Sequence, residues 1–250
     1  MDQKYILSSL DNALGVLQLF ISHNELNAGE ISSLSGLNKS TVFRILATLE
    51  NRGYLLRKEG GRYALGLKLF TLGQLVYSRM ELISIIHPYL EKLSRLGGET
   101  SHLSMMDDAT HIVFLDKVVS SSLLRMDTPL GYHQFAHLTG TGKAILAFET
   151  ERAIRQYLRM ADFPQKTDRS IPGAKEFLAV LEEVRAQGYA SDSEECEIGL
   201  TCYAVPVLDA SGYPIAAISS SGPTSRMTAR KEEHIRYLKE IAGEIHQILS

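Results

Sequence analysis

Cysteine is scarce in this chain, which has only Cys196 and Cys202. Two cysteines six residues apart, without companions, form neither a disulfide framework nor a zinc-binding pattern. Long apolar runs are missing too, since none approaches the roughly 20 residues that a membrane-spanning helix needs. The N-terminal segment MDQKYILSSLDNALG lacks the basic region and apolar core of a secretory signal. We therefore expect a protein of the reducing cytoplasm with no membrane partner.

A strong charge of one sign is also absent, because the net charge of the whole chain is −3 at pH 7. The balance is uneven along the chain. Residues 38–68 carry seven Lys or Arg against two Asp or Glu, whereas residues 81–250 carry seventeen against twenty-three. A basic island in an acidic chain favours local contact with a polyanion such as nucleic acid. The alternative is a solvated helix and turn that is basic by chance.

The composition is that of a folded globular protein. Hydrophobic residues make up 44% and charged residues 22% of 250 residues, which argues against disorder. A chain of this length holds one large or two modest domains. It shows no internal repeat and no low-complexity tract.

The N-terminal third begins with the pattern of two helices. A first helix would be capped by Ser9 or Asp11, and a short second helix, AGEISSLS, opens after Asn27. Gly36 then supplies a tight turn. The order and the short connection predict two helices packed against each other.

A third helix and a hairpin follow. Asn38 is the expected N-cap of a helix that ends near Gly53 at a C′ position. The segments YLLRKE and RYAL then read as two short strands joined by a Gly-Gly turn. Three helices followed by such a hairpin predict a winged helix-turn-helix domain over residues 1–66.

The third helix has one apolar face and one polar face. Its apolar residues recur at i, i+3, i+4 and i+7, and its other face begins with short or flexible donors suited to phosphates and base edges in a major groove. Arg44 lies about one turn further on and is placed to reach a guanine edge, while Lys58 and Arg62 on the hairpin suit phosphate or minor-groove contact. The alternative is that Ser40 and Thr41 only cap the helix and Arg44 is solvated. The predicted DNA-binding residues are Asn38, Lys39, Ser40, Thr41, Arg44, Lys58 and Arg62.

A linker follows at residues 67–81. Its segment LGLKLFTLGQLVYSRM is apolar around most of a helix circumference, so it needs burial on several sides. We expect it to bury against a second copy of the chain. A helix packed within its own domain is the alternative.

Residues 82–250 have the pattern of an α+β domain. The segments TSHLSMMDD, HIVFLDKV and SSLLRMDT read as strands, and residues 201–222 read as a hairpin around Asp-Ala-Ser-Gly. Single helices are expected at residues 83–98, 173–189 and 228–249, and a pair of helices at residues 142–160. Strands joined mostly by hairpins predict an antiparallel sheet.

The segment HLTGTGKAIL superficially resembles a phosphate-binding loop. His137 stands at the first glycine position and Ala144 follows Lys143, so the pattern does not match that of a nucleotide-hydrolysing site. What remains is a glycine turn leading into a helix, in which Gly140 and Thr141 bring backbone N–H groups close to a ligand. The helix N-terminus at Gly142 favours an anion.

The segment AGEISSLSGLNKSTVFRILATLENRGYLLRKEGGRYALG resembles the DNA-binding domain of the IclR family of bacterial transcriptional regulators. The resemblance continues with HLTGTGKAILA, RAQGYASDSEECEIGLTCYAVPV and AAISSSGP, and so covers nearly the whole chain. It implies a dimer or a dimer of dimers on an operator with inverted symmetry. It also implies a C-terminal effector-binding domain of the GAF or profilin-like type, with an antiparallel sheet.

The resemblance also places contacts to a small organic acid on matching positions. These implied effector-binding residues are Leu123, Met126, Gly140, Thr141, Asp192, Leu200, Cys202, Ser219 and Ser221. This chain has GYHQFAHLT where the family more often has an apolar segment, so His133 and Gln134 are expected to make the pocket mouth more polar. Each position has a structural alternative: the serines satisfy backbone groups, Cys202 fills the core, and Asp192 caps a turn.

Two other classes of function would need residue types that this chain contains. Cys202, His137 and Asp192 are the types needed for a nucleophile, a base and an orienting group, but no spacing requires that arrangement. A metal sensor would use His102, His111, His133 or Cys196, which lack a characteristic ligand spacing. We expect no catalytic residue, no metal and no cofactor. The predicted function is a DNA-binding transcriptional regulator, a repressor in preference to an activator, controlled by a small carboxylate; the alternative is a metal sensor or an effector-binding enzyme with a DNA module.

Overall fold

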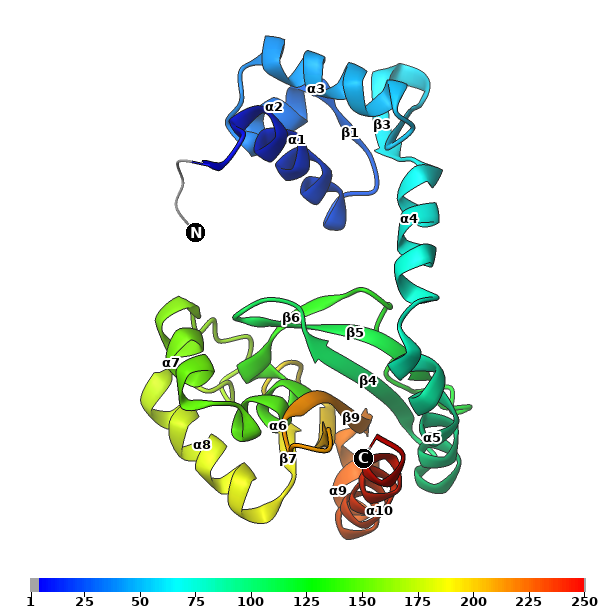
Figure 1. The fold of residues 1–250 in the computed structure, drawn as a ribbon, viewed down its shortest axis with the longest axis vertical. Helices are drawn as coiled ribbons and strands as arrows, with labels where there is room; N and C mark the ends of the chain where they lie inside the picture. The colour runs from blue at the N-terminus through cyan, green and yellow to red at the C-terminus, as the bar shows by residue number, and fades with distance from the viewer. Residues whose placement is uncertain (1–4, 250) are drawn as a thin grey trace. The chain divides into compact units, whose positions relative to one another are not determined.

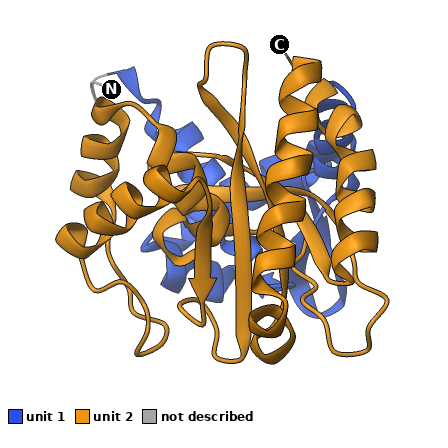
Figure 2. Cartoon of the chain, turned by 90° about the horizontal axis from the view of Figure 1, so that it is seen from below, with its two compact units in different colours: residues 1–80 blue, residues 81–250 orange. Residues whose placement is uncertain are grey.

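A computed structural model describes residues 5–249 and divides the chain into two compact units, residues 1–80 and 81–250 (Figures 1 and 2). The helical linker falls within the first unit. Within the described residues, no single helix has both the length and the apolar character needed to cross a membrane.

The first unit is a three-helix domain with a small antiparallel sheet of order β1-β3-β2. Its elements are α1 (Ser8–Gln18), the 3-10 turn η2 (Leu19–Ile21), β1 (Leu26–Asn27), α2 (Ala28–Ser35), α3 (Lys39–Asn51), β2 (Leu55–Arg57), the turn η3 (Glu59–Gly61), β3 (Arg62–Leu65) and α4 (Leu67–Tyr77). This is the predicted winged helix-turn-helix, with β2 and β3 as the wing.

The boundaries of α2 and α3 follow the predicted caps. The Asn27 side chain accepts hydrogen bonds from the backbone N–H groups of Gly29 and Glu30, and Glu30 accepts one from the backbone of Asn27, which completes a capping box. Gly36 ends α2 in the left-handed region at φ 70°. Asn38 caps α3 by accepting from the Thr41 N–H at 2.9 Å.

The predicted cap of α1 was wrong. The helix begins at Ser8, and Leu7 occupies the N-cap position without a side-chain hydrogen bond. Ser9 and Asp11 therefore lie inside the helix.

The core of the first unit comes from the apolar stripes of its helices. Val42, Ile45, Leu46 and Leu49 of α3 are all buried, as the periodicity predicts, and pack with Val16, Ile31 and the sheet residues Leu55 and Tyr63. The opposite face of α3 is therefore free to carry polar side chains.

The start of α4 is fixed against the helical domain. The Gly66 N–H donates to the Tyr54 carbonyl at 2.8 Å, and a side chain at Gly66 would overlap the carbonyl oxygen of Gly53. Only a glycine fits this close approach between two backbone segments. No residue of α4 is buried in the described chain, so the helix does not pack into its own domain, and Leu67, Phe70 and Val76 are exposed.

The second unit is built on a six-stranded antiparallel sheet of order β6-β5-β4-β9-β8-β7. Its strands are β4 (Thr100–Met106), β5 (His111–Val118), β6 (His133–Phe135), β7 (Ala190–Ser193), β8 (Leu200–Leu208) and β9 (Pro214–Pro223). Its helices are α5 (Glu81–Gly97), the turn η4 (Ala136–Leu138), α6 (Gly140–Phe148), α7 (Glu151–Met160), α8 (Ala174–Gln187), α9 (Thr224–Ala229) and α10 (Lys231–Leu249).

Helices cover both faces of this sheet (Figure 1). On one face, Ser101 of β4 donates to the Leu90 carbonyl of α5, and Ser220 of β9 bonds His234 of α10. On the other face α6 packs over β8 and β9, with α8 outside it. Because neighbouring residues of a strand point to opposite faces, Ser219 and Ser221 face α6.

The expected strand at residues 121–128 was wrong. This segment is an irregular loop held by long-range bonds: Thr100 Oγ1 donates to the Met126 carbonyl at 2.7 Å, and Arg226 donates to the Leu124 carbonyl at 2.8 Å. The expected helix at residues 228–249 is two helices, α9 and α10, with Arg230 between them. The expected antiparallel sheet and its 201–222 hairpin are confirmed.

Candidate functional site

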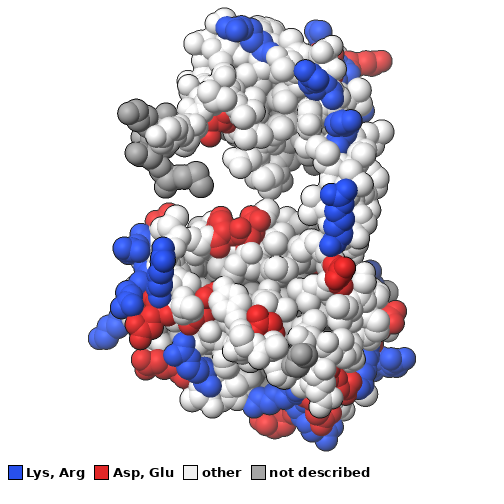
Figure 3. Space-filling model, viewed as in Figure 1, with Lys and Arg blue, Asp and Glu red and all other residues white. Residues whose placement is uncertain are grey.

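The polar face of α3 is exposed at the positions predicted to read DNA. Lys39, Ser40 and Arg44 are exposed, and Thr41 is half-buried. The Ser40 hydroxyl donates to Asn38 at 2.7 Å, so the start of the helix is ordered before any partner binds. Figure 3 shows Lys and Arg side chains over the region of α3 and the wing. An exposed helix start with polar and basic side chains is the feature expected of a helix that enters a major groove.

The two wing residues differ in their surroundings. Lys58 is exposed at the turn between β2 and β3, whereas Arg62 is half-buried. The Arg62 guanidinium donates to the Glu25 carbonyl at 2.7 Å and pairs with Glu30 at 3.3 Å. Arg62 is therefore engaged with its own domain, in contrast to the free phosphate contact that the sequence suggested. Its bonds attach the wing to the segment preceding α2.

The second unit contains a cavity of about 60 Å³ between α6, the sheet and the loops 126–132 and 196–199. Eight of the nine residues implied by the family resemblance lie in its lining. They are Met126, Gly140, Thr141, Asp192, Leu200, Cys202, Ser219 and Ser221.

Leu123 is the exception, and its prediction as a pocket residue was wrong. Its side chain is fully exposed and does not line the cavity. The segment around it is the irregular loop described above, in which Met126 turns inward and Leu123 outward. His133 is exposed and pairs with Asp107 at 3.0 Å, while Gln134 is buried in the lining, so only Gln134 makes the pocket more polar.

The floor of the pocket is set by strand register. Asp192 of β7 lies opposite Cys202 of β8, and Cys202 lies opposite Ser221 of β9, so three strands present these side chains in one row. Gly140 lies directly above them, since a side chain there would come within 3.1 Å of the Cys202 sulfur. Backbone and small side chains therefore meet closely, and the remaining space suits a small molecule.

The roof begins at the N-terminus of α6. Thr139 caps the helix by accepting from the Gly142 N–H at 3.0 Å, so α6 begins at Gly140, two residues earlier than predicted. Gly142 packs against the backbone of Ala136, where a side chain would not fit. The Gly140 and Thr141 end of the helix is thus held against the cavity, where a helix dipole favours an anion.

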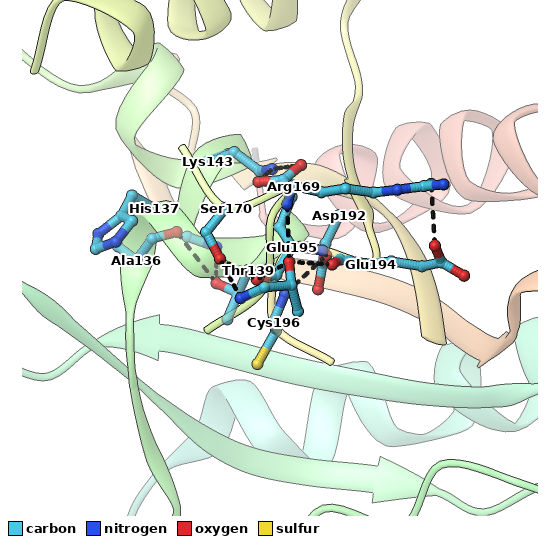
Figure 4. A network of polar contacts seen from close by, with 12 residues as sticks. Ala136, His137, Thr139, Lys143, Arg169, Ser170, Asp192, Glu194, Glu195 and Cys196 are labelled. Carbon is cyan, nitrogen blue, oxygen red and sulfur yellow. Dashed lines mark hydrogen bonds and ion pairs between the residues drawn. The ribbon is translucent and has the colours of Figure 1, made fainter. Parts of the chain in front are cut away.

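A buried ion pair fixes the loop after β7 (Figure 4). The Lys143 side chain is 1% exposed and its Nζ lies 2.5 Å from Glu195 Oε2. The Glu195 carbonyl accepts from the Ser170 hydroxyl at 2.6 Å, and the neighbouring Glu194 pairs with Arg169 at 3.0 Å. These bonds hold the loop that carries Cys196 and Glu197 into the lining.

Asp192 is the most perturbed carboxyl group of the lining. Its Oδ1 accepts from the backbone N–H groups of Glu195 at 2.8 Å and Cys196 at 3.4 Å. Burial raises the pKa of Asp192 to about 6, against the opposing effect of the Lys143 charge. This side chain can therefore change between an acceptor and a donor within the physiological pH range.

Several lining residues were not foreseen from the sequence. They come from strands, loops and a helix cap that meet only in the fold: Phe114, Thr128, Tyr132, Thr139, Cys196, Glu197 and Thr201. For Cys196 the sequence offers only the role of a metal ligand. The signal that could have found Lys143 and Glu195 is the presence of a lysine inside an otherwise apolar and glycine-rich helix, which requires a buried partner.

The catalytic alternative lacks its geometry. Burial raises the pKa of the Cys202 thiol to about 11, so the thiol is a poor nucleophile at neutral pH. His137 lies outside the lining and its Nδ1 bonds the Tyr157 hydroxyl at 2.7 Å, within a cluster of aromatic rings. For the metal alternative, no group of three His, Cys, Asp or Glu side chains within residues 5–249 is arranged to hold a metal ion.

Comparison with known proteins matches two family models along the chain. Residues 74–247 match the family described as bacterial transcriptional regulator IclR C-terminal, and residues 9–59 match the IclR helix-turn-helix domain. The HTH-type transcriptional regulator KdgR of Escherichia coli is 36% identical over 241 residues, which cover 96% of this chain and 91% of KdgR.

Solved structures show the same two-unit fold. The Thermotoga maritima IclR structure is 34% identical, with a TM-score of 0.73 over 98% of this chain and 99% of that one. An IclR homologue from Microbacterium hydrocarbonoxydans complexed with 4-hydroxybenzoate is 21% identical, with a TM-score of 0.81 over 96% of this chain and 98% of that one. The exposed basic face of α3, the linker helix and the matches over both units lead to one conclusion: the chain belongs to the IclR family of bacterial transcriptional regulators, and it is a DNA-binding regulator.

Proposed function

We propose that this regulator binds an inverted-repeat operator as a homodimer or a dimer of dimers, and that a small organic acid in the second unit modulates its binding. The observation that carries this proposal is the cavity below the N-terminus of α6, whose lining joins backbone donors, hydroxyl groups and the titratable Asp192. We place the protein in the cytoplasm, where a bacterial regulator meets its operator, and favour repression because occupying an operator is enough to block transcription.

For DNA, we propose that α3 enters the major groove with its N-terminal end leading. Arg44 is exposed one turn into the helix and reads a base edge, while Lys39, Ser40 and Thr41 contact phosphates near the helix start. Asn38 holds that end in place through its cap. On the wing, Lys58 contacts the backbone of the DNA, and Arg62 supports the wing through Glu25 and Glu30.

For assembly, we propose that α4 packs against the α4 of a second copy. The helix is apolar on most sides, and its side chains are exposed in the described chain. Burying an apolar side chain of this size contributes on the order of 1.5–3 kcal/mol, so several together suffice to hold two copies. Two α3 helices related by a twofold axis then match two half-sites about one helical turn apart.

For the effector, we propose that the carboxylate lies at the N-terminus of α6 beside Ser221 and Asp192. Backbone N–H groups of Gly140 and Thr141, hydroxyl groups and a protonated Asp192 provide donors without an arginine. The 4-hydroxybenzoate complex of the Microbacterium homologue supports an acid as the class of ligand. Binding changes the relative placement of the two DNA-binding units of the dimer, and this change is a coupling free energy between the sites.

The test is a thermal-shift screen of small carboxylates on the full chain, followed by operator gel shifts with each acid that raises the melting temperature. The variant Ser221→Ala with Asp192→Ala should lose the response to the acid and still bind operator. Ser220→Ala is the matched control, because Ser220 faces α10 on the opposite side of the sheet. A normal response in the double variant, or no shift with any carboxylate, would exclude this site.

A further inference from the structure

Beside the row of Ser221, Cys202 and Asp192 lies a group of buried polar atoms without partners. Both ring nitrogens of His102 and the hydroxyl groups of Ser104, Thr141 and Ser219 have no hydrogen-bond partner among residues 5–249. All four side chains are at most 1% exposed. An unpaired buried polar group costs about 1–3 kcal/mol, so a cluster of them indicates an occupant that supplies the missing bonds.

Strand register brings these groups to one place. His102 of β4 lies directly opposite Ser219 of β9, and Ser104 follows two residues later on the same face. The neighbouring residues Ser101 and Ser220 bond α5 and α10, so His102 and Ser219 face the other side, toward α6 and Thr141. Each of these residues is thus on the cavity side of the sheet.

The position of His102 relative to the pocket follows from its other neighbours. Its ring meets the edge of Phe114 with centroids 5.3 Å apart, and Phe114 lines the cavity, as do Ser219 and Thr141. Thr100, on the same face of β4, pairs with Ser221. The row of His102 and Ser219 therefore lies beside the row of Ser221, Cys202 and Asp192, about 6.7 Å along the strands.

The chemistry of His102 differs from that of the proposed carboxylate site. Burial and the charge of Lys117 lower the pKa of His102 to about 4, so the ring is neutral at pH 7. A neutral imidazole donates through one nitrogen and accepts through the other, as a hydroxyl group also does. A carboxylate only accepts, so it can bond the protonated ring nitrogen but not the unprotonated one, whereas a hydroxyl group can bond whichever nitrogen faces it.

From this juxtaposition we propose that His102, with Ser219 and Thr141, forms an inner subsite that recognises a hydroxyl group of the effector, so that the effector is a small hydroxy acid. The inference rests on the proposed function, because it adds a second polar contact to an acid bound at the α6 end. The two rows of side chains are about 6.7 Å apart, so the hydroxyl group of the effector should lie within a few bonds of its carboxylate.

The experiment moves a hydroxyl group along one carbon skeleton. The probes are butyrate and 2-, 3- and 4-hydroxybutyrate, with both enantiomers of the chiral acids, measured by calorimetry on the full chain. We expect at least one hydroxybutyrate to bind about tenfold or more tightly than butyrate, because the site's unpaired groups penalise the acid that lacks a hydroxyl. His102→Leu should remove this preference and change butyrate affinity by less than about twofold.

Stability without any acid provides the second measurement. Replacing an unpaired buried group with an apolar one of similar size is close to neutral or stabilising, so His102→Leu should melt no lower than the wild type. Ser220→Ala should keep the hydroxyl preference, whereas Ser219→Ala should weaken it.

Three results would overturn the inference while sparing the proposed function. They are equal affinity for butyrate and every hydroxybutyrate, an unchanged preference in His102→Leu, and a His102→Leu protein that melts several degrees lower because the ring has a purely structural role. Failure of all four probes, when another carboxylate responds in the wider screen, also overturns it. Failure of every carboxylate overturns both.

Discussion

The two units of this regulator place their polar functional groups in opposite ways. In the first unit, Lys39, Ser40 and Arg44 stand exposed on a helix whose other face forms the core. In the second unit, His102, Asp192 and Ser219 lie inside the fold, and the cavity that Asp192 and Ser219 line is small. One unit presents a surface to a large partner, and the other encloses a space for a small one.

Whether a polar side chain is exposed or buried decides how its substitution affects folding and binding. An exposed side chain is solvated until DNA binds, so changing it alters binding and leaves folding nearly unaffected. A buried polar group is removed from water in every folded molecule, so it affects stability as well as binding. Substitutions in the two units should therefore separate in unfolding experiments.

The largest effect is expected for Lys143→Met. The substitution leaves Glu195 without its partner in a mostly buried position, which typically destabilises a protein by about 3–5 kcal/mol. Denaturant unfolding of the full chain measures this loss. The double variant Lys143→Met with Glu195→Gln should recover much of it, and a single variant as stable as the wild type would show that the ion pair is not needed.

A pH dependence of acid binding is expected next. Burial raises the pKa of Asp192 from 3.8 to about 6, so the proton is held more tightly in the folded chain, and its stabilising contribution is present at low pH and lost as the pH rises through about 6. An anionic acid prefers the protonated side chain. Its affinity should rise by up to about tenfold per pH unit between pH 7.5 and 6.

Asp192→Asn is the matched variant for the pH experiment, because its amide donates a hydrogen bond at every pH. Calorimetry with a carboxylate found in the screen should give a flat profile for this variant over the same range. An equally steep profile in Asp192→Asn would assign the titration to another group.

Among the exposed residues of the first unit, Arg44 should have the larger effect. Arg44→Ala should reduce the discrimination between operator and unrelated DNA by about 1–3 kcal/mol without lowering the melting temperature. Gel-shift competition between operator and unrelated DNA measures the discrimination. Arg52→Ala removes the same charge at the far end of α3 and should preserve sequence preference. An unchanged preference in Arg44→Ala would exclude a reading role for that residue.

The smallest effect is expected for Lys58→Ala, which removes one phosphate contact. Affinity for operator and unrelated DNA should weaken alike, and the slope of log affinity against log salt should fall by about 1. A titration at several salt concentrations measures the slope. If only operator binding weakened, Lys58 would be a base contact instead.

The sequence predicted the first unit well because its signals are local. Asn27, Gly36 and Asn38 act within one helical turn of their own positions, and the apolar stripe of α3 is set by its period alone. The cap of α1 was missed, and so was the engagement of Arg62, whose partners Glu25 and Glu30 lie more than thirty residues away.

The pocket was less accessible to sequence reasoning because its parts meet only through long-range packing. The family resemblance identified most of the floor, but the 121–128 loop depends on Thr100 and Arg226, which no local pattern connects to it. Strands β8 and β9 are buried on both faces, so they lack the alternation that would show which serines point inward. The unpaired state of His102 is likewise visible only in the fold.

The contact between Gly66 and the turn at Gly53 has a practical consequence for making chimeras. Because no side chain fits at Gly66, the hairpin, the turn after α3 and the N-cap of α4 form one rigid joint. A DNA-binding module exchanged between relatives should therefore be cut within α4, after this joint. A cut between Gly53 and Gly66 would pair the backbone of one protein with that of another at this close contact.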